Sequence, residues 1–222
     1  MLALLKEAPG PGNVRLAEVP EPQAGPGQVR IAVQATGICG SDLHILHDDI
    51  KLLVRPPAVM GHEFSGVIDQ VGEGVTGWKA GDRVTAETTV RTCGKCLSCR
   101  SGAYNRCSQK EILGYIHNGA FAPYTVVAAD RLYALPDEVD FISGAMTEPL
   151  ACCVRLLYQL ATIRPYDLVV VAGPGAIGLL CAQLAHAAGA RTCVVGAAVD
   201  RERLALAREL GADWTLVAGE DD

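Results

Sequence analysis

The sequence has no long apolar run, no recognisable secretion signal and no excess of positive charge. Its first six residues, M-L-A-L-L-K, are too few for the apolar core of a signal peptide, and its apolar stretches are shorter than a membrane span. We therefore expect a cytoplasmic protein with no membrane contact. The formal net charge of -6 argues against a nucleic-acid partner, because phosphate backbones are bound by clustered Lys and Arg. Small molecules are the expected partners.

Internal repeats and low-complexity tracts are also absent. The 222 residues are 50% hydrophobic and include 24 glycines, which predicts a globular protein of one or two domains. Without a secretion signal, the nine cysteines are expected in a reducing compartment. There, metal binding and simple burial are more common roles for cysteine than disulfide formation.

Four of these cysteines form the strongest chemical signal in the chain. They fall within fifteen residues, as Cys93, Cys96, Cys99 and Cys107. A tetrahedral zinc ion takes four thiolates at ~2.3 Å, and two-residue gaps let successive cysteines turn toward one ion. Four protein ligands leave no position for substrate. The spacing therefore predicts a structural zinc site, and we expect the reaction chemistry elsewhere.

Two styles of sequence divide the chain near residue 148. Residues 1–147 are predicted to form an antiparallel, barrel-like domain, with strands that include 29–33, 64–69 and 124–128. Residues 148–222 alternate predicted helices at 149–161, 176–188 and 201–210 with predicted strands at 168–172, 192–195 and 214–217. Such alternation is typical of a parallel sheet, so we expect an α/β protein with a β-rich N-terminal part.

The sequence G-P-G-A-I-G at residues 173–178 follows a predicted apolar strand and opens a predicted helix. In that context the G-x-G-x-x-G pattern predicts a dinucleotide site, with the pyrophosphate at the helix N-terminus. We expect Gly173 to make the tight turn, Gly175 to let the backbone approach the phosphates, and Gly178 to let helix and strand pack closely. The alternative is a glycine turn that holds no ligand.

The acidic residue typical of NAD sites is missing from its usual place. It ends the next strand about 20 residues on and binds the ribose 2'-hydroxyl, but here Ala197 or Ala198 stands there. We expect the following Asp200 to cap the helix that begins at Arg201. The missing carboxylate, with Arg201 and Arg203 nearby, suits the 2'-phosphate of NADP. Both arginines would also suit a solvated helix face, so NAD or NADP remain as candidates.

Three residues from separate segments have the chemistry of a catalytic zinc site. Cys39 lies in G-I-C-G-S-D-L-H, and His62 and Glu63 lie in M-G-H-E-F-S-G. A thiolate, an imidazole and a carboxylate supply three ligands and leave a fourth position for water or a substrate oxygen. Each residue type alone is ordinary. Their order, followed by the four cysteines and the glycine loop, predicts the site.

Together these motifs resemble the zinc-dependent medium-chain alcohol dehydrogenase superfamily over essentially the whole chain. The segments G-D-R-V at 81–84, G-A-F-A at 119–122 and E-P-L-A at 148–151 extend the resemblance. Glu63 and E-P-L-A are most similar to the sorbitol (polyol) and threonine dehydrogenase branch. The resemblance implies a GroES-like catalytic domain with a structural zinc lobe at 1–147. It also implies the first half of a Rossmann dinucleotide-binding domain at 148–222.

The same resemblance implies one catalytic zinc on Cys39, His62 and Glu63 and one structural zinc on the four clustered cysteines. Further implied roles are a proton relay at Ser41 and His44, a place beside the metal for Glu148, and cofactor contacts at Ile177 and Arg203. Imidazole titrates near neutral pH, so a histidine can pass on a proton that a serine hydroxyl accepts. The alternatives are a turn hydrogen bond for the serine, a surface or second-shell position for His44, and a helix-terminal position for Glu148.

The implied reaction is hydride transfer from a polyol or other secondary alcohol to NAD(P), which forms the ketone. Threonine dehydrogenase-type oxidation of an amino alcohol is a second possibility. A non-catalytic zinc-binding module of the same fold is a third, and a zinc-free quinone reductase would have no need of the cysteines. Because the chain ends at Asp222, shortly after the third predicted strand, we expect a fragment of a longer enzyme that is inactive or weakly active by itself. We expect the full-length protein to form a homodimer or homotetramer.

Overall fold

The computed structural model describes residues 1–49 and 54–220. Its chain separates into two compact units, Met1–Glu148 and Pro149–Asp222. The strands of the first unit are β1 (Leu2–Lys6), β2 (Val14–Glu18), β3 (Gln28–Gly37), β4 (Ala58–Val59), β5 (Glu63–Val71), β6 (Arg83–Ala86), β7 (Thr89–Arg91), β8 (Glu111–Ile112), β9 (Tyr124–Ala128) and β10 (Leu132–Ala134). Its α-helices are α1 (Gly40–His47), α2 (Leu97–Arg100) and α3 (Phe141–Ala145), and α4 (Thr147–Val154) crosses the boundary. Single 3-10 turns occupy Tyr104–Arg106 and Ala129–Arg131.

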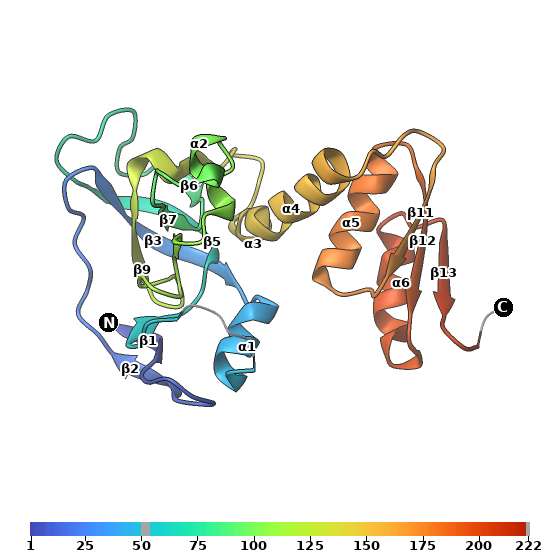
Figure 1. Ribbon diagram of the computed structural model, residues 1–222, viewed down its shortest axis with the longest axis horizontal. Helices are drawn as coiled ribbons and strands as arrows, with labels where there is room; N and C mark the ends of the chain where they lie inside the picture. Colours follow the sequence, from blue (N-terminus) through green and yellow to red (C-terminus); the bar gives the residue numbers. More distant parts are fainter. Residues whose placement is uncertain (50–53, 221–222) are drawn as a thin grey trace. The chain divides into compact units, whose positions relative to one another are not determined.

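A five-stranded antiparallel sheet in the order β10-β6-β5-β3-β9 forms the core of the first unit (Figure 1). In β3, Val29 and Ile31 are fully buried. Arg30 lies between them and points to the other face, as the two-residue period of a strand requires. There its Nε donates to Asp69 Oδ2 of β5 at 2.6 Å. The predicted strands at 29–33, 64–69 and 124–128 are confirmed within β3, β5 and β9. Smaller sheets join β2-β1-β4 and β7-β8.

The pairing of β3 with β5 explains how distant sequence motifs meet. The two strands are antiparallel, and Gly37 at the end of β3 lies opposite Glu63 at the start of β5. Cys39 lies two residues after the end of β3, as the N-cap residue of α1, and His62 immediately precedes β5. The register of these two strands therefore brings the G-I-C-G and G-H-E segments together at the same end of the strand pair.

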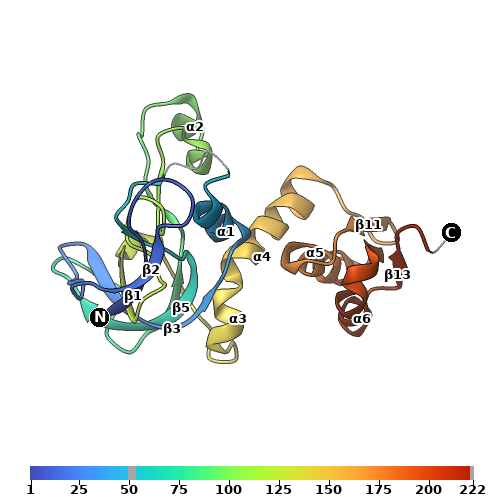
Figure 2. The same cartoon turned by 90° about the horizontal axis from the view of Figure 1, so that it is seen from below.

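The second unit holds a parallel sheet in the order β11-β12-β13, formed by Leu168–Ala172, Arg191–Gly196 and Trp214–Val217. Two helices, α5 (Ala176–Ala187) and α6 (Arg201–Glu209), pack on one face of this sheet (Figures 1 and 2). Small and aliphatic residues of both helices pack against Val194 of the central strand, and Val194 is fully buried. The predicted strand and helix alternation is confirmed.

The predicted helix at 149–161 differs in detail. The α-helix α4 begins earlier, at Thr147, and gives way to a π-helical segment at Arg155–Leu160. The segment packs Leu157 into a buried cluster with Cys153 and Cys181. Among the described residues, no helix is both long and apolar enough to cross a membrane.

Candidate functional site

Cys39, His62 and Glu63 converge where β3 ends and β5 begins. One ligand atom from each lies within 4.8 Å of the other two. His62 and Glu63 are buried, and Cys39 is half-buried. Gly37 makes room for the carboxylate, because a Cβ atom there would stand 2.4 Å from Glu63 Oε2. The sequence therefore supplies both the donors and the space that they need.

The donor set of this cluster fits zinc. Sulfur, nitrogen and oxygen atoms are all zinc ligands, and three protein ligands leave the fourth tetrahedral position open. The side chains of Cys39, Glu63 and the neighbouring Glu148 bring several acidic groups around one imidazole. A divalent cation relieves the repulsion within such a group.

The electrostatics follow from this crowding. Burial acts to lower the pKa of His62, but the hydrogen bond with Cys39 and the nearby Asp42, Cys39 and Glu148 raise it overall. Burial also raises the pKa of Glu148, against the opposing charge of His62 and together with the like charge of Glu63. Glu148, on the first turn of α4, is thus placed close to both His62 and Glu63.

Asp42 belongs to this site and was missed in the sequence analysis. Its Oδ2 accepts the backbone N–H of Cys39 at 2.9 Å, and its Oδ1 lies 3.8 Å from His62 Nδ1. Both Asp42 Oδ1 and His62 Nδ1 are buried and lack a hydrogen-bond partner in the described part of the chain. The available signal was an acidic residue three positions after Cys39, where it can reach back to the start of a helix.

The two predicted relay residues lie on adjacent turns of α1. Ser41 Oγ is buried and has no hydrogen-bond partner among residues 1–49 and 54–220. The His44 side chain is 42% exposed, and its Nδ1 lies 2.7 Å from Asp49 Oδ1. Residues three apart on a helix share a face. The helix therefore carries one buried hydroxyl and one solvent-accessible imidazole on the same side.

The four clustered cysteines converge on a second centre. All four sulfurs lie within 4.8 Å of one another, with 3.9 Å between the Sγ atoms of Cys93 and Cys99 and 3.5 Å between those of Cys96 and Cys99. Four sulfurs around a tetrahedral zinc stand about 3.8 Å apart, whereas a disulfide needs about 2.05 Å. The spacing fits a metal and excludes disulfides within the cluster.

Backbone N–H groups already stabilise thiolate in this cluster. Those of Lys95 and Cys96 lower the pKa of Cys93 to about 6, while desolvation raises the pKa of Cys99 to about 11. The segment has little core of its own, since α2 and the 3-10 turn after it bury no residue. A bound metal is the natural source of its stability.

The glycine loop between β11 and α5 has the geometry of a phosphate cradle. Gly173 adopts a φ of +97°, which favours glycine, and a Cβ on Gly178 would meet Gly173 O at 2.0 Å. A Cβ on Gly175 would meet no atom within 4 Å. That open space faces the N-terminus of α5, where backbone N–H groups and the helix dipole favour an anion. Ile177 is 47% exposed on the first turn.

The expectation that the Asp200 side chain caps α6 is wrong. Asp200 occupies the N-cap position of α6 but makes no side-chain cap there. Its Oδ2 instead accepts the N–H of Ala197 at 3.1 Å, because the chain forms a 3-10 turn, Ala198–Asp200, before the helix. Arg203 Nη1 lies 3.6 Å from Asp200 Oδ1, and Arg201 pairs with Glu220.

Comparison with known proteins identifies the family. The model of the alcohol dehydrogenase GroES-like domain matches residues 25–137, and that of the zinc-binding dehydrogenases matches residues 176–222. The chain is 46% identical to sorbitol dehydrogenase of Halalkalibacterium halodurans, and this match covers 100% of the chain and 64% of the relative. It is 41% identical to D-arabitol-phosphate dehydrogenase of Enterococcus avium, with 100% and 63% covered.

A solved structure from Sinorhizobium meliloti 1021, described as a zinc-binding dehydrogenase bound to NADP, matches with a TM-score of 0.88. It is 34% identical, and the match covers 100% of this chain and 63% of that one. The chain thus spans less than two thirds of the length of these relatives. The predicted GroES-like fold, followed by the first half of a Rossmann sheet, is confirmed. The chain belongs to the family of zinc-binding alcohol dehydrogenases with a GroES-like domain.

Proposed function

We propose that the protein acts in a zinc-dependent dehydrogenase that transfers hydride from a polyol or other secondary alcohol to NAD(P) and forms the ketone. Residues 1–147 would act as the catalytic domain and residues 148–222 as the dinucleotide-binding part. The observation that carries the proposal is the convergence of Cys39, His62 and Glu63 with one coordination position left open.

Zinc, when bound there, supplies Lewis acidity that lowers the pKa of an alcohol. In this proposal Cys39, His62 and Glu63 hold the ion, and Asp42 orients His62 through its unpaired Oδ1. Glu148 stands near His62 and Glu63, as an alternating ligand or as part of the proton path. The second zinc, on the four cysteines, is structural in this proposal because its ligands fill every position.

A proton must leave the substrate hydroxyl as hydride leaves its carbon. Ser41 Oγ is buried near the start of α1, and His44 on the same face reaches solvent. Ser41 would accept the proton, and His44 would pass it to water because imidazole titrates near neutral pH. Asp49 Oδ1 lies 2.7 Å from His44 Nδ1 and would hold the ring in its orientation.

The dinucleotide would bind at residues 173–178, with Gly175 leaving space for the pyrophosphate and Ile177 and Arg203 contacting the cofactor. The alanines after β12 remove the usual 2'-hydroxyl ligand, which supports NADP. Asp200 lies just beyond these alanines, where its Oδ2 accepts the N–H of Ala197. An acidic residue at the end of this strand suits the ribose 2'-hydroxyl of NAD, so its position supports NAD. We therefore propose NAD or NADP, to be separated by titration of each.

The proposal is tested by assaying cofactor reduction with sorbitol, threonine and simple secondary alcohols, with zinc analysis of the same protein. The assay uses the protein encoded by the complete open reading frame. Two zinc ions and turnover with an alcohol would support the dehydrogenase. Two zinc ions with no turnover of any of these substrates would favour a non-catalytic zinc module.

We further propose a cytoplasmic homo-oligomer. Four of the nine cysteines gather as a candidate metal site, a use of cysteine that is common in a reducing compartment. The dimer or tetramer rests on the family resemblance. Light scattering of the purified protein gives its mass directly, and a monomer would contradict this part of the proposal.

A further inference from the structure

The imidazole ring of His62 packs against a second ring, that of Tyr115. The two ring centroids lie 5.4 Å apart, and the ring planes meet at 65°, which is an edge-to-face arrangement. Both residues are buried, with 6% of His62 and 8% of Tyr115 exposed. Such a pair is favourable beyond its burial, because the positive edge of one ring meets the negative face of the other. Tyr115 therefore restrains one side of a candidate metal ligand.

Tyr115 lies on a segment, residues 113–121, that is docked on the backbone just before His62. Backbone N–H groups at residues 119–121 donate to carbonyl oxygens at residues 59–61, at 2.8–3.0 Å. Two glycines allow this close approach: a Cβ atom would stand 2.6 Å from Gly61 O at Gly114 and 2.0 Å from it at Gly119. The 113–121 segment therefore lies as close to this backbone as glycine permits.

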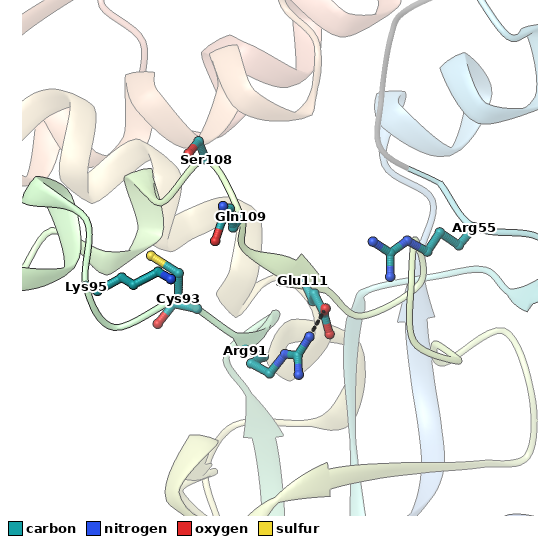
Figure 3. A pocket seen from close by; sticks show the side chains of 8 residues that line it. Arg55, Arg91, Cys93, Lys95, Ser108, Gln109 and Glu111 are labelled. Carbon is teal, nitrogen blue, oxygen red and sulfur yellow. Dashed lines mark hydrogen bonds and ion pairs between the residues drawn. The ribbon is translucent and has the colours of Figure 1, made fainter.

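The 113–121 segment is also held where it begins, after β8. Glu111 of β8 is buried and pairs with Arg91 of β7, as Figure 3 shows. The other carboxylate oxygen of Glu111 lies 2.7 Å from His117 Nε2, within the segment. The Arg55 N–H donates to Tyr115 O at 2.9 Å. These contacts fix the backbone that carries the Tyr115 ring.

The Tyr115 side chain also meets the helix that carries Asp42. It forms a buried cluster with Ile45 of α1 and with Met60. Asp42, on the same helix, places its Oδ1 3.8 Å from His62 Nδ1. A carboxylate and an aromatic ring thus both restrain the imidazole. Support of this kind from neighbouring side chains holds a ligand in the geometry that a metal needs.

We propose that Tyr115 is a positioning residue for His62. Its ring holds the imidazole with Nδ1 towards Asp42, which leaves Nε2 for a metal. Leucine in place of Tyr115 would remove the ring pair and let the imidazole take further orientations. A metal would then have to order the ring as it binds, which weakens binding. The link to a metal rests on the proposed function, whereas the orientation of the ring does not.

A competing role would use the Tyr115 hydroxyl instead of its ring. Burial raises the pKa of Tyr115 to about 12, against the lowering effect of the Ser41 hydroxyl, so the phenol is neutral at physiological pH. A neutral phenol can donate a hydrogen bond to a neighbouring oxygen. The two roles differ in their response to Tyr115→Phe, which removes the hydroxyl and keeps the ring.

The first measurement is the affinity of each of the two zinc sites, by competition with a chromogenic chelator. We expect Tyr115→Leu to weaken zinc binding at the Cys39–His62–Glu63 centre about three- to tenfold and to leave the four-cysteine site unchanged. Tyr115→Phe should change neither affinity. The matched control is Ile116→Ala, which truncates an aliphatic side chain packed on the same cluster and should also change neither. Tyr115→Met is a second variant that fills more of the vacated space.

The second measurement is the order of the His62 ring in zinc-free protein, by NMR of ¹⁵N-labelled histidine, which needs neither metal nor turnover. We expect an ordered ring in the wild type and in Tyr115→Phe, and a mobile ring in Tyr115→Leu and Tyr115→Met. Equal ring order in all four proteins would overturn the proposal. Losses in Tyr115→Phe as large as those in Tyr115→Leu would overturn it in favour of the hydroxyl role. Wild-type protein that binds zinc at the four cysteines alone would contradict the proposed function, and the ring order would still decide this inference.

Discussion

Asp42 Oδ1 lies 3.8 Å from His62 Nδ1, and neither atom has another partner in the described structure. Burial raises the pKa of Asp42, and the opposite charge of His62 opposes that rise. Since Nδ1 faces the carboxylate, Nε2 is the nitrogen left for a metal. A carboxylate behind a metal-binding histidine fixes the ring and makes it a better ligand.

We therefore expect Asp42→Asn to weaken zinc binding at the Cys39–His62–Glu63 centre about 10- to 100-fold, because the amide cannot supply the negative charge. Competition with a chromogenic chelator measures this affinity. Asp49→Asn is the matched control, since it removes an exposed carboxylate that contacts His44 instead. An unchanged zinc affinity in Asp42→Asn would show that the two residues are merely neighbours.

The four-cysteine segment makes a separate prediction. Replacing Cys99 with Ser should release one of two zinc ions and lower the melting temperature, because the segment buries little apolar surface and depends on its metal. Zinc analysis and thermal unfolding are the measurements. Cys152→Ser, at an exposed cysteine outside both clusters, should keep both ions. Soluble, folded Cys99→Ser protein that retains two zinc ions would refute the structural assignment.

Two substitutions in the glycine loop should differ in their effect on stability. Gly178→Ala should destabilise the second unit by about 1–3 kcal/mol, because the new Cβ would stand 2.0 Å from Gly173 O. Gly175→Ala has space for its Cβ and an ordinary φ of -74°, so stability should change by less than about 1 kcal/mol.

The same Gly175→Ala methyl group would occupy the space assigned to the pyrophosphate, so we expect it to weaken NAD(P) binding at least tenfold. Chemical denaturation and fluorescence titration with each dinucleotide separate the two effects. If Gly175→Ala binds both dinucleotides as the wild type does, the cradle is only a turn.

Much of the fold followed from local patterns. Short β-rich pieces between Pro, Gly and Asp turns predicted the strands at 29–33, 64–69 and 124–128, and the glycines at 173–178 predicted a turn between a strand and a helix. The helix α1 was not predicted, because its buried residues are only Asp42 and Ile45 and no apolar stripe marks it. The π-helical segment at Arg155–Leu160 has no sequence signature of its own.

The candidate ligands were recognisable because cysteine, histidine and glutamate have few alternative uses in such an order. Asp42 was missed because its role depends on distance to His62, twenty positions away in the chain, and only the β3–β5 register sets that distance. Asp200 was placed as a cap of α6, whereas an additional 3-10 turn directs its carboxylate to Ala197.

The most direct test of the central claim is anomalous X-ray diffraction at the zinc edge from crystals of the zinc-loaded protein. We expect two peaks, one among the four cysteine sulfurs and one between Cys39, His62 and Glu63 with a coordination position free of protein atoms. A single peak among the four cysteines, with these three side chains unliganded at full zinc loading, would contradict the account.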